Sequence, residues 1–154
     1  MSSQIPSFYR FFFTWFEPLT SLYGAYLVLA EPDNYLNSFI APAAWSATRD
    51  IAHNTLLRQM GASFVYVSLS QAVLLRYTSD PNVWKILNGS LLGWDAILLY
   101  GLWAGLSSQG RLSLGALRAE DWTAIVPTVI ITLLRAAVVA GVGFSNKKVP
   151  AKEL

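Results

Sequence analysis

The most constraining feature of the sequence is an apolar stretch that carries one acidic residue near its centre. Residues 84–106 form a segment of about 23 residues, long enough as an α-helix to cross the roughly 30 Å hydrocarbon core of a bilayer. Asp95 lies in the middle of this segment. A carboxylate at that depth costs roughly 3 kcal/mol on insertion scales, so Asp95 is a candidate functional residue and needs a partner elsewhere in the chain.

The composition is that of an integral membrane protein. Of the 154 residues, 54% are hydrophobic and only 13% are charged, whereas soluble domains carry about 25% charged residues. The net charge is +2, but the basic residues are scattered, which argues against nucleic-acid binding. Because the chain has no cysteine and a single histidine, His53, we predict no disulfide, no cysteine- or histidine-based metal site, and no metal or organic cofactor.

Hydropathy divides the chain into four apolar spans separated by polar connections. The spans cover about residues 8–29, 56–75, 84–106 and 122–144. We therefore predict an all-α membrane protein in which four transmembrane helices form an up-down bundle, within one domain of residues 1–154. In the longest connection, residues 35–45 are mildly apolar and contain Pro42, which is compatible with an interfacial or re-entrant segment.

Four spans place both termini on the same side of the membrane. Six basic residues are expected on that side: Arg10, Arg76, Lys85, Lys147, Lys148 and Lys152. Four are expected on the other: Arg49, Arg58, Arg111 and Arg118. This excess predicts cytoplasmic termini by the positive-inside rule, and we expect the membrane to be that of the endoplasmic reticulum.

Polar residues at helical spacing predict which faces of three spans point into the bundle. In the first span they are Arg10, Thr14, Glu17, Ser21 and Gly24. In the second they are Gln59, Ser63, Tyr66 and Ser70. In the fourth they are Thr128, Thr132 and Arg135. The third span carries a glycine seam instead, which permits close packing on a neighbouring helix or on a second copy in a homodimer. Its members are Gly89, Gly93, Gly101 and Gly105.

Three ionisable residues on three different spans share one predicted depth. Counted from the side of the termini at 1.5 Å per residue, Glu17, Asp95 and Arg135 each lie roughly 14–17 Å deep. Arg135 stays charged and is expected to keep Asp95 ionised, while Glu17 has no second cation and is expected to stay protonated. Such a pair predicts acid–base chemistry, with Glu17 as acid and Asp95 as base or the reverse. The same residues equally fit a structural ion pair between helices.

Aromatic side chains of the spans are candidate substrate-binding residues, because a π face stabilises positive charge that develops on carbon, by about 0.5–2 kcal/mol. The predicted set is Trp15, Tyr66, Trp94, Tyr100 and Trp122. Contact with lipid or with a neighbouring helix is the alternative role for these residues, Trp94 in particular.

Several short motifs resemble a group of small four-helix fungal membrane proteins. They are Phe11–Leu19 (FFFTWFEPL), Gly93-Trp94-Asp95, Asp121-Trp122, Arg135 and Gly141-Val142-Gly143. Some similar proteins open or rearrange epoxides in natural-product pathways, and the resemblance implies epoxide or carbocation chemistry that uses Glu17, Asp95, Trp122 and Arg135. A likeness to four-helix sterol isomerases is weaker, because His53 has no glutamate at helical spacing.

Our leading hypothesis is a membrane-embedded acid–base enzyme that opens an epoxide on a lipophilic molecule by hydrolysis, cyclisation or rearrangement. One alternative is a membrane terpene cyclase that protonates an alkene or epoxide. Another is a non-catalytic protein that binds lipid or assembles partners through the glycine seam. A small transporter subunit is a further alternative, although the paired halves and broken helices of transporters are not evident.

Overall fold

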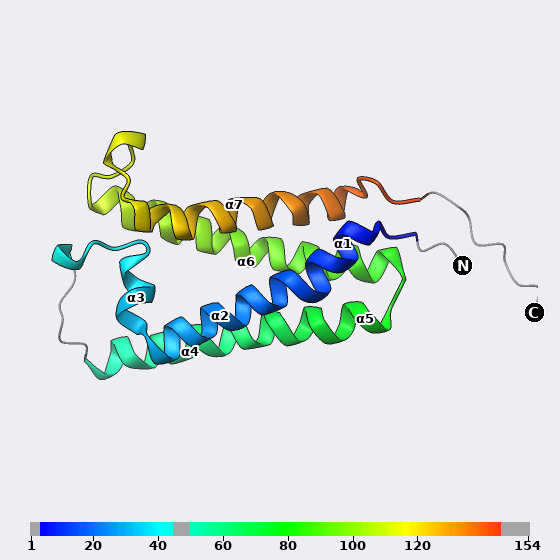
Figure 1. The fold of residues 1–154 in the computed structure, drawn as a ribbon, viewed down its shortest axis with the longest axis horizontal. Coiled ribbons are helices and arrows are strands. Elements are labelled where there is room, and N and C mark those ends of the chain that lie inside the picture. The colour runs from blue at the N-terminus through cyan, green and yellow to red at the C-terminus, as the bar shows by residue number, and fades with distance from the viewer. Residues whose placement is uncertain (1–3, 45–49, 146–154) are drawn as a thin grey trace, which may run out of the picture.

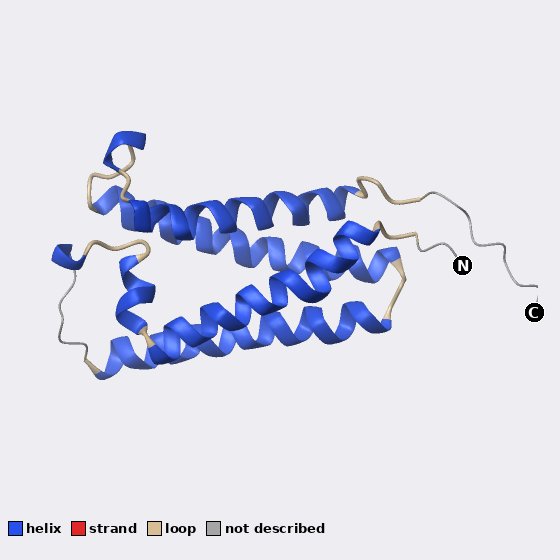
Figure 2. Cartoon of the chain, in the orientation of Figure 1, coloured by secondary structure: helices blue, strands red, loops and turns tan. Residues whose placement is uncertain are grey.

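The computed structural model describes residues 4–44 and 50–145, and every regular element within them is helical (Figures 1 and 2). The prediction of an all-α protein is confirmed. The elements are α1 (Ser7–Phe11), η1 (Phe12–Phe16), α2 (Glu17–Ala30), α3 (Pro32–Asn37), η2 (Pro42–Ala44), α4 (Ile51–Leu69), η3 (Ser70–Leu74), α5 (Leu75–Tyr77), α6 (Pro81–Ser108), η4 (Leu114–Ala116) and α7 (Ala119–Ala140). Trp45, Arg49, Lys147, Lys148 and Lys152 lie outside the described residues.

The longer elements join into four rods that lie lengthwise beside one another (Figure 1). The first rod is α1, η1 and α2 in succession, and the second is α4, η3 and α5. The third and fourth rods are α6 and α7. These two are long and apolar enough to cross a membrane. The short helix α3 and the 3₁₀ turn η2 lie in the connection where the sequence suggests an interfacial segment.

Local chemistry decides where the rods begin and end. The Asp50 side chain accepts a hydrogen bond from the backbone N–H of His53, so α4 begins before the predicted position 56. The Asp80 side chain caps α6 in the same way. At its C-terminal end, α7 stops at Ala140 rather than at the predicted position 144. The reason is that Gly141 adopts the left-handed conformation, with a φ of 76°.

Glycines bring α2 and α4 close together. A Cβ placed on Gly61 of α4 would lie 2.8 Å from side-chain carbons of Leu29, so no larger residue fits without displacing Leu29. Gly24 of α2 similarly faces the ring of Phe64, at 3.6 Å. In the other half of the molecule α6 packs along α7.

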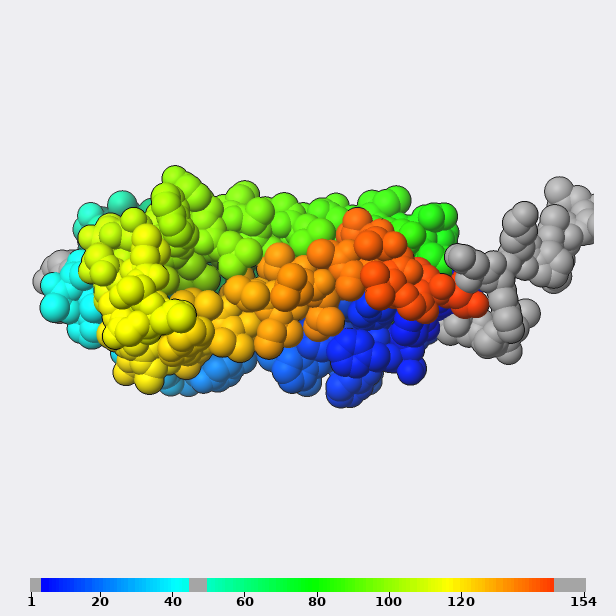
Figure 3. All heavy atoms as spheres, turned by 90° about the horizontal axis from the view of Figure 1, so that it is seen from above, coloured from blue at the N-terminus to red at the C-terminus, as the bar shows by residue number. Residues whose placement is uncertain are grey.

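The main apolar cluster lies at the end of the rods where the described chain begins and ends. Trp84, Phe13 and Val138 have no exposed surface there, and Ile5 and Tyr9 are buried beside them. Figure 3 shows the end of α7 lying directly against the first rod. The backbone N–H of Ser145 donates to the carbonyl of Gln4 (3.1 Å), which places residues 4 and 145 on the same side of the fold.

An ionic cluster around the buried Asp121 lies at the opposite end. Asp121 of α7 binds the side chains of both Arg111 and Arg118. Arg118 also donates to the Asn37 carbonyl (2.6 Å), and Arg111 donates to that of Phe39 (3.2 Å). The two arginines held by Asp121 thus join the connection between α6 and α7 to the C-terminal end of α3 and to Phe39.

Candidate functional site

The structure brings together the three ionisable residues that share a predicted depth. The Arg135 guanidinium, on α7, binds Asp95 of α6 through Nη1 and Glu17 of α2 through Nη2. All three side chains are buried, with exposed fractions of 2%, 3% and 1% for Arg135, Asp95 and Glu17. A single guanidinium therefore links three of the four rods. We call Glu17, Asp95 and Arg135 the ionic trio.

Two further groups complete the surroundings of the ionic trio. The fully buried Gln71 of η3 donates from Nε2 to Oε1 of Glu17 (3.1 Å), which brings in the remaining rod. The carbonyl of Leu91 accepts a second hydrogen bond from Arg135 Nη1 (3.2 Å). Among the described residues, Glu17 Oε2, Gln71 Oε1 and Arg135 Nε have no hydrogen-bond partner, although they are buried. Buried polar atoms are nearly always hydrogen-bonded, so these three atoms are candidates for hydrogen bonds to a bound molecule.

The polar face of the second rod differs from the predicted one. Gln59 and Tyr66 point outward, and Tyr66 is 69% exposed, while Ser68 and Gln71 are the buried polar residues. The reason is the close approach of Gly61 to Leu29, which fixes the rotation of α4. The predicted faces of the other two spans do contain the buried Thr14, Glu17 and Arg135.

Two π-helical segments lie side by side at the level of the ionic trio. They are η1, directly before Glu17, and η3, which contains Gln71. Because proline has no N–H, Pro18 cannot pair with the carbonyl of Thr14 four residues earlier. Arg76 supplies the missing donor from Nη2 (2.8 Å). The widened turns of η1 and η3 direct Glu17 and Gln71 toward the centre of the fold. Such π-helical turns are frequent at functional sites.

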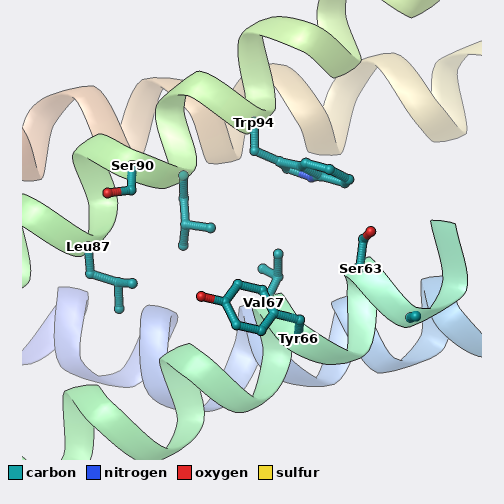
Figure 4. A pocket seen from close by; sticks show the side chains of 8 residues that line it. Ser63, Tyr66, Val67, Leu87, Ser90 and Trp94 are labelled. Atoms are coloured by element: carbon teal, nitrogen blue, oxygen red, sulfur yellow. The ribbon is translucent and has the colours of Figure 1, made fainter. Parts of the chain in front are cut away.

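Beside the ionic trio, a groove of about 500 Å³ lies between α4 and α6 (Figure 4). It is lined by Ala62, Ser63, Tyr66, Val67, Leu87, Ser90, Leu91 and Trp94. Tyr66 and Trp94, two of the predicted substrate-binding residues, project into it from opposite sides. Leu91 lines the groove and also gives its carbonyl to Arg135, so a single residue joins the groove to the ionic trio.

The other predicted substrate-binding residues lie away from this groove. Trp15 faces outward, with the Arg76 guanidinium 4.0 Å from its ring centre. Tyr100 lies beside Trp103 on the exposed face of α6, with ring centres 5.8 Å apart. Trp122 is partly exposed in the first turn of α7.

The glycine seam of α6 is used only in part within the chain. Gly89 faces Val139 of α7 at 3.8 Å, and Gly105 faces the Phe39 carbonyl at 4.0 Å. A Cβ placed on Gly93 or Gly101 would meet no described atom within 4 Å. The middle of the seam is therefore open on the outer surface.

The arrangement defines an all-helical protein with a buried ionic site. Comparison with protein families assigns the chain to a family. Residues 2–145 match the family described as "Domain of unknown function (DUF7704)", and the chain belongs to this family. No match was found among curated proteins or among solved structures.

Proposed function

We propose that all four rods cross a membrane and that the bundle is embedded in it. Support comes from α6 and α7, which are long and apolar enough to span. The other two rods expose large apolar side chains along their length: Phe11, Trp15, Leu19, Leu22, Leu56, Leu69, Val73 and Leu74. A surface of this kind suits lipid rather than water. We also propose that both termini face the cytoplasm and that the membrane is that of the endoplasmic reticulum.

We propose that the protein is an acid–base enzyme that opens an epoxide on a lipophilic molecule. The observation that carries this proposal is the convergence of two carboxyl groups on one buried guanidinium. With both carboxyls ionised the ionic trio would carry a net charge of −1, which is unfavourable in a water-poor interior. One carboxyl that keeps a proton makes the site neutral and supplies an acid beside a base.

The proposed reaction needs only these groups because ring strain already activates an epoxide. Glu17 donates its proton to the epoxide oxygen as the carbon–oxygen bond breaks. Water or a hydroxyl of the substrate attacks the carbon, and Asp95 accepts the proton that it releases. The product is a diol or a cyclic ether alcohol. The proton then returns from Asp95 to Glu17. Arg135 stabilises whichever of the two carboxyls is ionised.

The experiment compares lipophilic extracts of source cells with and without the gene by untargeted mass spectrometry. We expect an epoxide precursor to accumulate without the gene, and wild-type protein to remove it. Glu17→Gln and Asp95→Asn should fail to do so, whereas Glu120→Gln, the same change at an exposed carboxyl of α7, should succeed. An unchanged profile in cells that express the gene, or full rescue by both variants, contradicts the proposal.

A second candidate function is non-catalytic lipid binding. It is favoured by one observation, namely that none of the residues lining the groove is ionisable near neutral pH. In that case the ionic trio serves only to hold the rods together. Asp95→Asn would then lower the melting temperature without altering any metabolite.

A further inference from the structure

The groove between α4 and α6 is open to the surface and is large enough to hold a small molecule. Its volume of about 500 Å³ lies within the roughly 300–1,000 Å³ range of sites for drug-sized ligands. Aliphatic side chains of Val67, Leu87 and Leu91 form much of its wall. Since the groove lies at the surface of rods that we place in lipid, a ligand would reach it sideways from the bilayer rather than from water.

Among the described residues, the polar groups of the groove that have no partner are hydrogen-bond donors. The hydroxyls of Ser63 and Ser90 donate to backbone carbonyls of their own helices, at 2.9 Å and 3.0 Å. In the described part of the chain, the Tyr66 hydroxyl and the Trp94 indole N–H have no hydrogen-bond partner. Both are donors, and Figure 4 shows these two side chains on opposite walls. The groove thus offers hydrogen-bond donors within an apolar surround.

We infer that this groove binds a lipophilic molecule that carries an acceptor oxygen and that enters laterally from the bilayer. An acceptor oxygen of this molecule receives hydrogen bonds from Tyr66 and Trp94 while its apolar part packs on the aliphatic wall. The further step, that this molecule is the substrate, rests on the proposed function. Leu91 lines the groove and also gives its backbone carbonyl to Arg135, so it lies between the bound molecule and the ionic trio.

The test is photolabelling of the full chain in phosphatidylcholine nanodiscs, with a diazirine- and alkyne-bearing farnesol 10,11-epoxide as probe. The matched variants are Ala62→Phe, which fills the groove, and Ala96→Phe, which adds the same ring to an exposed position of α6 outside it. We expect labels on the α4 and α6 peptides that excess unlabelled epoxide reduces at least tenfold. Ala62→Phe should abolish this competed labelling, and Ala96→Phe should leave it unchanged.

Equal labelling of Ala62→Phe and wild type overturns the inference. So does labelling that excess epoxide leaves unchanged, which would mean that the acyl chains of ordinary lipids fill the groove. Glu17→Gln and Asp95→Asn should keep the competed labelling, because neither residue lines the groove. Competed labelling without any turnover therefore contradicts the enzyme proposal alone. Turnover that Ala62→Phe leaves intact contradicts only the step that identifies the bound molecule with the substrate.

Discussion

Arg135 binds Glu17 across 118 positions of sequence, and the same guanidinium binds Asp95. No other ion pair among the described residues joins three of the rods. The first and last rods are therefore held to each other, and to α6, by one side chain that has almost no exposure.

Replacing Arg135 by methionine should destabilise the protein strongly. The change leaves two carboxyls buried without their cation, and breaking a buried pair from one side costs about 3–5 kcal/mol. Thermal unfolding in detergent should show a large fall in melting temperature. Adding Glu17→Gln and Asp95→Asn to Arg135→Met should recover most of it, because the remaining groups are neutral. A melting temperature that Arg135→Met leaves unchanged would show that the ionic trio contributes nothing to the fold.

The pairing of Arg76 with the free carbonyl of Thr14 can be measured by a double-mutant cycle with Pro18. Arg76→Met should cost about 1–3 kcal/mol, because it leaves a partly buried carbonyl without a donor. Pro18→Ala restores the N–H that the helix lacks, so Arg76→Met should cost less in that background. Arg76→Met also removes the contact of Arg76 with Trp15, but it does so in both backgrounds, so the cycle cancels this contribution. Strictly additive effects would argue against this pairing.

The close approach of α2 and α4 predicts a sharp difference between two glycines. Gly61→Ile should lower stability by about 1–3 kcal/mol, since its Cβ would lie 2.8 Å from Leu29 carbons. Gly93→Ile is the matched control on α6, where a Cβ meets no described atom within 4 Å. Chemical or thermal unfolding of the two variants gives the comparison. Equal effects would mean that helix propensity, not packing, dominates.

The cap of α4 should respond to acid. The backbone N–H of His53 donates to the Asp50 carboxylate and lowers the pKa of that carboxyl below its ordinary value. A lowered pKa means that the cap stabilises the helix start above the ordinary Asp value of about 3.9 and is lost as pH falls through the lower folded value. The amide shift of His53 in NMR spectra should titrate below pH 3.9 or so. In Asp50→Asn this titration should vanish, and a midpoint above the ordinary value would contradict the capping.

The ionic trio could be predicted because ionisable residues are rare within apolar spans, so three of them at one depth stand out. The role of Gln71 was not predicted, because the polar residues at helical spacing in the second span, Gln59, Ser63, Tyr66 and Ser70, indicated a different rotation of the helix. On α4 that rotation follows from Gly61 packing on Leu29, a contact between distant segments. The cluster around Asp121 was missed for a related reason. Acidic residues in a first helical turn suggest only a favourable interaction with the helix dipole, whereas both partners of Asp121 come from the preceding connection.

The most direct test of acid–base catalysis is single-turnover kinetics in nanodiscs, with the precursor that accumulates in cells lacking the gene and with ¹⁸O-labelled water. Wild type and Glu120→Gln should convert the precursor at the same rate, and hydrolysis would place ¹⁸O in the product. Glu17→Gln and Asp95→Asn should each slow conversion at least about 100-fold while the chain remains folded. Normal rates in both variants would contradict acid–base catalysis by the ionic trio.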